Sequence, residues 1–205
     1  SAPYIVACSH ADPKTDSKLI MIALNGIQML LDFEVFPPDQ TQSILAILIK
    51  QASSGRSEIQ MKVLQIELQV TNTIAKDQEA AVYFSESIIH SLLFLAIELC
   101  NGPHVAVTST ALVTIRQVAG IVLNLAAKLV ASNATFAKHK DLADTNDVPA
   151  IGSVKSILKF IKDLSLSCRC EPTSWLPGKK LASSSCLDII HDILAGWKSL
   201  FVDVA

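Results

Sequence analysis

The sequence carries little charge, and it lacks the short motifs that mark common enzymes. Charged residues make up 18% of its 205 residues, and the net charge is −2 with a pI of about 6.2. This balance gives no overall basic field that would favour nucleic acid or an anionic membrane. The phosphate-loop, nucleophile-elbow, zinc-helix and dinucleotide-binding motifs are absent. We therefore predict no catalytic residue and no cofactor. An enzyme with a site that the sequence does not reveal is the remaining alternative.

Long uncharged apolar runs are also lacking. No run reaches about 18 residues, so the sequence predicts no transmembrane helix. Half of the residues are nevertheless hydrophobic and the mean hydropathy is +0.41, so the excess apolar surface must be buried within the chain or against a partner. The first residues, SAPYIVACSH, lack the charged region of a signal peptide. We expect the chain to be a fragment of a longer protein.

The side chains that could bind a metal do not form a complete set. The five cysteines are odd in number and lie mostly within apolar helical patterns, which indicates reduced thiols in a cytosolic protein. Cys168 and Cys170 lack a second Cys/His pair at zinc-finger distance, so we predict no metal site. His90 has no acidic or cysteine partner at helical spacing on its own stretch. A hydrogen-bonded histidine in the core or at its edge is therefore favoured over a ligand or a base.

The stretch from Thr108 to Val130 predicts a central helix. Its apolar residues recur at three- and four-residue spacing, which is typical of one buried helical face: Leu112, Ile115, Ala119, Val122, Ala126 and Leu129. A narrow polar stripe accompanies them, made of Thr114, Gln117, Asn124 and Lys128. We expect neighbouring helices to pack on nearly all sides of this element.

Other helices are predicted from the same periodicity and from helix-end signals. Their expected ranges are 4–9 (a helical fragment), 16–31, a helix opened by Pro37-Pro38-Asp39 and closed by Ser54-Gly55, a helix starting at Ser57, and 79–100, 153–168 and 180–202. Ser57 and Gln60 fit a capping box. The last two helices are expected to bury Val154, Ile157, Leu158, Ile161 and Leu164, and Leu187, Ile190, Leu194, Trp197 and Phe201. Residues 132–150 are the longest region without a firm pattern, and no strand is predicted.

The spacing of these helices predicts the fold class. Helix starts near residues 16, 57 and 105 lie about 41 and 48 residues apart, close to the length of a HEAT or armadillo repeat. Each helix pair leaves apolar surface that only the next pair can cover, which accounts for the high hydrophobicity. We therefore predict an all-α, HEAT/armadillo-like solenoid of about seven helices, forming a single domain over residues 1–205.

Two polar surfaces are candidates for binding a partner. The helix starting at Ser57 has the inner residues Ile59, Val63, Ile66 and Val70, and its outer face carries Lys62, Gln65, Gln69 and Asn72. Helical repeats bind partners on exposed ridges formed by successive helices. Arg116 and Gln117 would extend this ridge from the central helix; alternatively, they cap neighbouring carbonyls inside the stack.

A second stripe is basic and comprises Lys155, Lys159 and Lys162 on one helix. A solvated face is the commoner explanation of such a stripe, and contact with anionic lipid or an acidic partner is the alternative. Asp188 and Asp192 share a face at i,i+4 spacing, where a solvated acidic edge is favoured over a catalytic pair.

Several segments resemble the dimerisation and cyclophilin-binding (DCB) domain of large Arf guanine-nucleotide exchange factors. The resemblance starts in PYIVACSHADPKTDSKLIMIALNGIQMLLDFEVF and includes the apolar pattern from Ala23 to Leu30. It continues in IQMKVLQIELQVTNT at 59–73, Thr114 to Val118, SVKSILKFIKDLSLSC at 153–168 and the closing helix. Trp175-Leu176 followed by Gly178 looks more like the branch that lacks the exchange domain, the monensin-sensitivity proteins.

The resemblance implies a non-catalytic scaffold module in Golgi and endosomal vesicle trafficking. It implies a cytoplasmic protein that is peripheral to trans-Golgi and endosomal membranes. Its expected partners are an Arf-like small GTPase, neighbouring regions of the same scaffold and a second copy of the chain. A peripheral membrane module that contacts lipid is the alternative function.

Overall fold

The computed structural model describes residues 2–33, 35, 40–76, 85–137, 149–176, 178 and 181–198. These residues contain eight helices and no strand: α1 (Ala2–His10), α2 (Ser17–Asp32), α3 (Thr41–Ala52), α4 (Ser57–Lys76), α5 (Glu86–Cys100), α6 (Val105–Ala137), α7 (Pro149–Cys168) and α8 (Ser183–Gly196). The predicted all-α class is confirmed.

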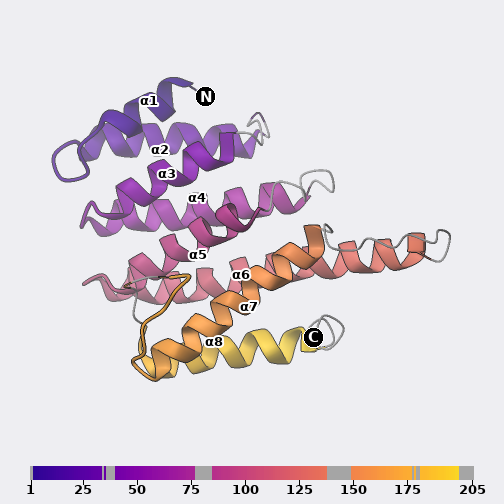
Figure 1. Ribbon diagram of the computed structural model, residues 1–205. Helices are drawn as coiled ribbons and strands as arrows, with labels where there is room; N and C mark the ends of the chain where they lie inside the picture. The colour runs from indigo at the N-terminus through magenta and orange to yellow at the C-terminus, as the bar shows by residue number, and fades with distance from the viewer. Residues whose placement is uncertain are drawn as a thin grey trace.

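The helices form two layers (Figure 1). Odd-numbered helices contact each other in the order α1, α3, α5 and α7, and even-numbered helices do so in the order α2, α4, α6 and α8. Each odd helix also packs on the even helix that follows it. This arrangement is a solenoid of antiparallel helix pairs, as the repeat spacing predicts.

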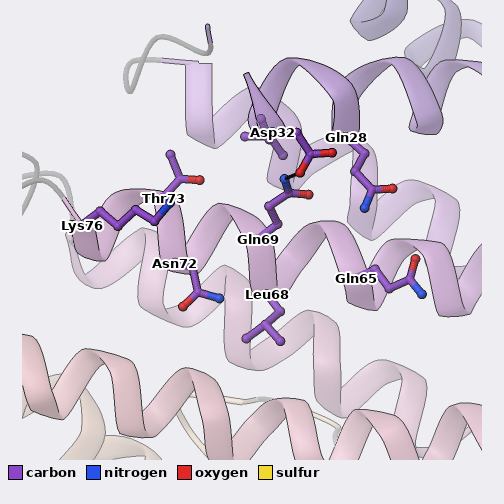
Figure 2. Close-up of a pocket in the computed structure, with 9 residues that line it drawn as sticks. Gln28, Asp32, Gln65, Leu68, Gln69, Asn72, Thr73 and Lys76 are labelled. Atoms are coloured by element: carbon purple, nitrogen blue, oxygen red, sulfur yellow. Dashed lines mark hydrogen bonds between the residues drawn. The ribbon is translucent and has the colours of Figure 1, made fainter. Parts of the chain in front are cut away.

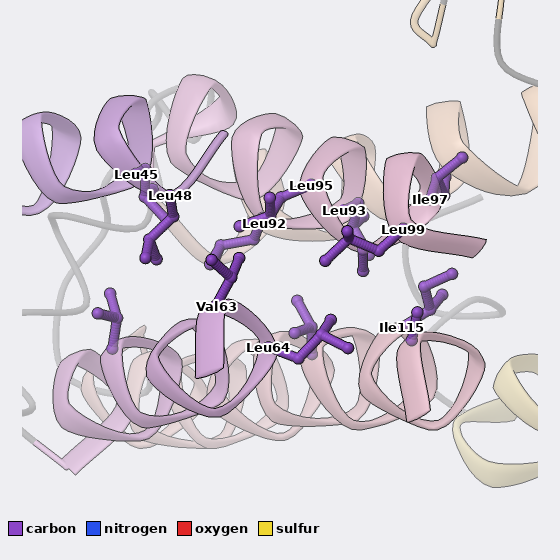
Figure 3. Packing of buried hydrophobic residues seen from close by; sticks show 14 of the residues in the cluster. Leu45, Leu48, Val63, Leu64, Leu92, Leu93, Leu95, Ile97, Leu99 and Ile115 are labelled. Carbon is purple, nitrogen blue, oxygen red and sulfur yellow. The ribbon is translucent and has the colours of Figure 1, made fainter. Parts of the chain in front are cut away.

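A continuous hydrophobic cluster lies between the two layers. It runs from Cys8 in α1 to Ile193 in α8. Figure 3 shows its middle part, where leucines of α3 and α5 face Val63, Leu64 and Ile115 of α4 and α6. The predicted inner face of α4 is confirmed, because Ile59, Val63, Ile66 and Val70 are all buried.

The central helix α6 contacts α4, α5, α7 and α8. Among its predicted core residues, Ile115, Ala119, Val122 and Ala126 are buried and Leu112 is half-buried; the side chain of Leu129 lies outside the described residues. Thr114, predicted on the polar stripe, is buried, and its hydroxyl donates to the Thr110 carbonyl at 3.0 Å. A threonine can occupy the core when its hydroxyl is satisfied by the preceding helical turn.

One stretch of α6 meets the length and composition of a membrane span. Val105–Lys128 has a mean hydropathy of 1.6 and is long and apolar enough to cross a membrane, although the lack of a long uncharged run in the sequence predicts no transmembrane helix. The core helix of a helical stack passes the same test, and α6 packs against four other helices.

Several predicted helix details are corrected. Helix α5 begins at Glu86, not near residue 79, because Ser85 is extended and its hydroxyl caps the amide of Ile88. The capping box at Ser57 does not form: the Gln60 amide donates to the Ala52 carbonyl at 2.9 Å, joining α4 to the end of α3. The proline-led start of α3 lies outside the described residues.

The buried face of α8 differs from the predicted one. On α7, Val154, Ile157 and Leu164 are buried as predicted, Ile161 is half-buried, and Leu158 is the exception. Leu158, Leu187 and Leu194 are 41%, 59% and 42% exposed. The described part of α8 buries Cys186, Ile189 and Ile193, one position away from the predicted set, and Ile190 and Trp197 are half-buried. Phe201 lies outside the described residues. The cause is that α8 has two adjacent apolar stripes, and α6 and α7 cover only one of them.

Candidate interaction surface

A groove runs between α2 and α4. It has a volume of about 340 Å³ and is lined by Gln28, Leu31, Asp32, Gln65, Leu68, Gln69, Asn72, Thr73 and Lys76. Figure 2 shows that its α4 side chains come from successive turns of one helix face. The Gln69 amide donates to the Asp32 carboxylate at 2.5 Å, and the Lys62 ammonium donates to the Gln28 side chain. Two of the predicted ridge residues therefore also join α4 to α2.

A second groove lies between α4, α6 and α8. Its volume is about 460 Å³, and its lining residues are Leu68, Asn72, Val113, Arg116, Gln117, Gly120, Ile121, Asn124 and Trp197. The Trp197 indole lies across α6 and donates to the Asn124 side chain at 2.9 Å. A side chain at position 120 would place its Cβ 3.1 Å from this ring, so glycine allows the close approach of the indole.

The two grooves meet at Leu68 and Asn72, which line both of them. We call the continuous surface made by the two grooves the α4 face. It includes five of the six predicted partner-binding residues: Gln65, Gln69, Asn72, Arg116 and Gln117. The sixth, Lys62, lies beside it and bonds to the lining residue Gln28.

Arg116 and Gln117 lie at the edge of the second groove. The guanidinium of Arg116 forms an ion pair with Asp192 of α8, with Nε 2.8 Å from Oδ2, and both side chains are partly exposed. Gln117 is exposed. Gln117 therefore lies on the surface, whereas Arg116 joins α6 to α8. Asp192 is also not simply solvated, because it joins α8 to α6, whereas Asp188 is exposed. An exposed ion pair of this kind contributes about 0–1 kcal/mol to stability.

The basic stripe lies on α7, in the other layer. Lys155, Lys159 and Lys162 are all exposed. The Lys159 ammonium is 2.5 Å from the Glu86 carboxylate of α5, and this hydrogen bond is the largest cause that lowers the pKa of Glu86. The middle lysine is therefore engaged with its neighbouring helix.

A polar cluster fixes the loop between α7 and α8. His90 of α5 forms a hydrogen bond with the Trp175 carbonyl at 2.7 Å and meets the indole edge-on, as expected for a hydrogen-bonded histidine at the edge of the core. The Trp175 indole donates to Glu86 at 3.1 Å. Sequence patterns gave no signal for this cluster, because Trp175 lies 85 residues from His90 and 89 residues from Glu86 in the chain.

Asp163 of α7 also holds this loop, because its side chain binds backbone amides of the loop. Its buried carboxylate accepts the amides of Trp175 and Leu176 at 2.7 and 2.6 Å, and that of Ser174 at 3.4 Å. A carboxylate that accepts several backbone amides is well stabilised in the core. The Trp175-Leu176 pair singled out in the sequence therefore has a structural role in this chain.

Glu67 carries a buried carboxyl group that the sequence analysis did not identify. It lies on α4 between Val63 and Val70, its side chain is wholly buried, and neither carboxylate oxygen has a hydrogen-bond partner among the described residues. Burial raises its pKa well above the usual value. Residue 67 lies four positions after Val63 and three before Val70. This helical spacing places it on the inner face of α4, and it is the sequence signal that could have predicted its burial.

The cysteines are free thiols in mainly shielded positions. Burial raises the pKa of Cys8 and of Cys186 to about 11, and that of Cys100 to about 12, with Glu67 adding to the last shift. These thiols are therefore protonated at neutral pH. The described residues contain no group of three His, Cys, Asp or Glu side chains that could hold a metal ion.

Comparison with protein families identifies the class of domain. The model of the Mon2/Sec7/BIG1-like dimerisation and cyclophilin-binding (DCB) domain matches residues 2–127, more than half of the chain. The chain belongs to this family. The DCB match covers α1 to α5 and most of α6, so it includes most of the α4 face. Helices α7 and α8 lie beyond it, together with the Trp175-Leu176 pair. No curated protein and no solved structure matches the chain.

Membership of the DCB family defines the broad class of activity. A DCB domain is a non-catalytic scaffold module of the Arf exchange-factor family. The chemistry of the α4 face agrees with this class, because its grooves are lined by apolar side chains together with the carboxamides of glutamine and asparagine. Such a surface suits contact with another macromolecule.

Proposed function

We propose that residues 1–205 form one helical repeat domain of a trafficking scaffold at trans-Golgi and endosomal membranes, and that its α4 face binds an Arf-like small GTPase. The observation that carries this proposal is the meeting of two grooves at Leu68 and Asn72. The domain also associates with a second copy of itself and with neighbouring regions of the same scaffold.

The composition of the α4 face supports a protein partner. Its apolar lining residues include Leu68 of α4, Val113 of α6 and Trp197, the residue that follows α8. Tryptophan is enriched among the residues that carry most of the binding energy in protein interfaces. Gln65 and Asn72 line the first groove, and Asn72 and Gln117 line the second. Each of these exposed carboxamides can both donate and accept a hydrogen bond.

A pull-down tests the proposal. The immobilised chain is incubated with a panel of Arf and Arf-like proteins, each loaded with a GTP analogue or with GDP. We expect capture of one or more Arf-like proteins in one nucleotide state. A panel in which no GTPase is captured in either state would contradict the proposal.

Lipid contact through Lys155, Lys159 and Lys162 is the alternative, and the same preparation tests it. Co-sedimentation with anionic liposomes should be weak, because Lys159 is already paired with Glu86 and an exposed cationic stripe contributes only about 1 kcal/mol per lysine near such a surface. Strong binding that is lost in Lys155→Ala with Lys162→Ala would favour the lipid-contacting function instead.

A further inference from the structure

Helix α2 has an exposed face whose pattern is palindromic. Residues Lys18, Ile22, Asn25, Met29 and Asp32 follow each other at steps of four and three, the spacing of a helix–helix contact. Read from either end, the order is charge, apolar, amide, apolar, charge, and the two terminal charges are opposite. Ile22 and Met29 are 64% and 58% exposed, so no described helix covers these two apolar side chains.

We propose that this face binds α2 of a second copy of the chain in an antiparallel pair, with the two-fold axis beside Asn25. This inference rests on the self-association proposed above. In the antiparallel pair, Lys18 lies opposite Asp32 of the second copy, and Ile22 lies opposite Met29 of the second copy. The two Asn25 side chains meet at the axis, where paired carboxamides can donate to and accept from each other.

The charges select this arrangement over a parallel one. A parallel pair would place Lys18 against Lys18 and Asp32 against Asp32, and like charges in contact are unfavourable. In an antiparallel pair, Lys18 of each copy faces Asp32 of the other, so the two-fold axis produces two such contacts. Asp32 remains available for this contact, since it is exposed and accepts the hydrogen bond from Gln69 through Oδ1, which leaves Oδ2 for the second copy.

An exposed aromatic ring and a surface hollow lie at opposite ends of α2, so the same two-fold axis would bring the ring of one copy to the hollow of the other. Phe33, just beyond the end of α2, is 72% exposed. A hollow of about 320 Å³ lies at the other end of the helix, and its lining includes Lys18, Met21, Ile22 and Arg56. The antiparallel pairing brings Phe33 of the second copy to this hollow. The contact area of one helix and one aromatic ring is small, so the dimer is weak and forms only at high concentration.

Charge exchange tests the pairing. Sedimentation velocity over a range of concentrations is measured for wild type, Lys18→Glu, Asp32→Lys and the double variant. Each single variant should weaken association by roughly tenfold, because it places like charges together at two symmetric positions. The double variant should recover most of the loss, since the introduced glutamate then faces the introduced lysine of the second copy. Melting temperatures close to wild type show that the fold is kept.

Cross-linking tests the axis independently. Asn25→Cys places two thiols together at the axis, whereas Lys18→Cys places them far apart, because residues 18 and 32 are separated by about 21 Å along the helix. Under mild oxidation, Asn25→Cys should form a covalent dimer faster than Lys18→Cys and faster than wild type, which carries the exposed Cys170.

The outcomes separate this inference from the proposed function. Suppose that the wild type associates. The α2 pairing alone is then overturned if the double variant does not recover association, or if Asn25→Cys does not cross-link faster than Lys18→Cys. A wild type that stays monomeric at every concentration overturns both the pairing and the proposed self-association. GTPase binding is tested separately with substitutions of Gln65 and Asn72 on α4, and it is not judged from Asp32→Lys, because Asp32 lines the α4 face.

Discussion

Glu67 is a carboxylic acid held in the core, and no residue in the described part of the chain forms a hydrogen bond with its side chain. Burial keeps its pKa well above 4.5 in the folded chain, while the unfolded chain has the ordinary value. Below pH 4.5 both states bind the proton and no penalty arises. As the pH rises further, only the unfolded chain releases the proton. The free energy of unfolding therefore falls until the folded pKa is passed, by up to about 1.4 kcal/mol per pH unit.

Replacing Glu67 with glutamine should remove this loss. Glutamine keeps the shape of the protonated acid but does not titrate. Urea denaturation at several pH values between 5 and 8 should show a smaller decline in stability for Glu67→Gln than for wild type. Parallel declines in the two proteins would mean that Glu67 reaches solvent or a partner in solution.

The residues that could be predicted from the sequence are those whose roles depend on their own helix. The inner face of α4 follows from spacing alone, and so does the exposed position of Gln65 and Asn72. The ion pair of Arg116 with Asp192 and the contacts of His90 with Trp175 depend on how distant segments pack. No spacing rule within one helix could identify those partners.

Four other helices pack on α6. A charged substitution on its buried face should therefore destabilise the chain far more than one on its exposed face. Val122 is fully buried, whereas Val113 is 48% exposed. Val122→Asp should unfold the chain, because a buried, unpaired carboxylate costs several kcal/mol, a large part of the stability of a typical domain. Leu123→Asp, also at a buried position, should behave in the same way.

Val113→Asp is the matched control on the same helix. It should change stability by about 0.5 kcal/mol or less, as surface substitutions usually do. Thermal unfolding followed by circular dichroism measures both effects. Equal melting temperatures for Val122→Asp and wild type would show that α6 is not a core element.

Helix α8 shows where periodicity stops being informative. Leu187, Ile190 and Leu194 form one apolar stripe, and Cys186, Ile189 and Ile193 form another beside it. The hydrophobic period is the same for both stripes. Only the positions of α6 and α7 decide which stripe is buried, and those positions are not encoded within α8.

At the scale of the whole molecule, the alternation of the two layers could be predicted and the grooves could not. Repeat spacing and high hydrophobicity require helix pairs that cover one another, and the DCB match over residues 2–127 agrees with that architecture. The grooves depend on details such as Gly120, which lets the Trp197 indole lie on α6. The α4 face therefore exists only in the packed stack.

The most direct test of the α4 face is a calorimetric titration with the Arf-like protein that the pull-down captures. Gln65→Ala with Asn72→Ala removes two exposed amides from this face, and Gln42→Ala removes an exposed amide from α3 in the other layer. We predict that the first variant binds at least about tenfold more weakly, a loss of about 1.4 kcal/mol, with an unchanged melting temperature. We predict that Gln42→Ala binds like wild type. If wild type, the Gln65→Ala with Asn72→Ala variant and Gln42→Ala all bound with equal affinity, the claim that the α4 face binds the GTPase would be contradicted.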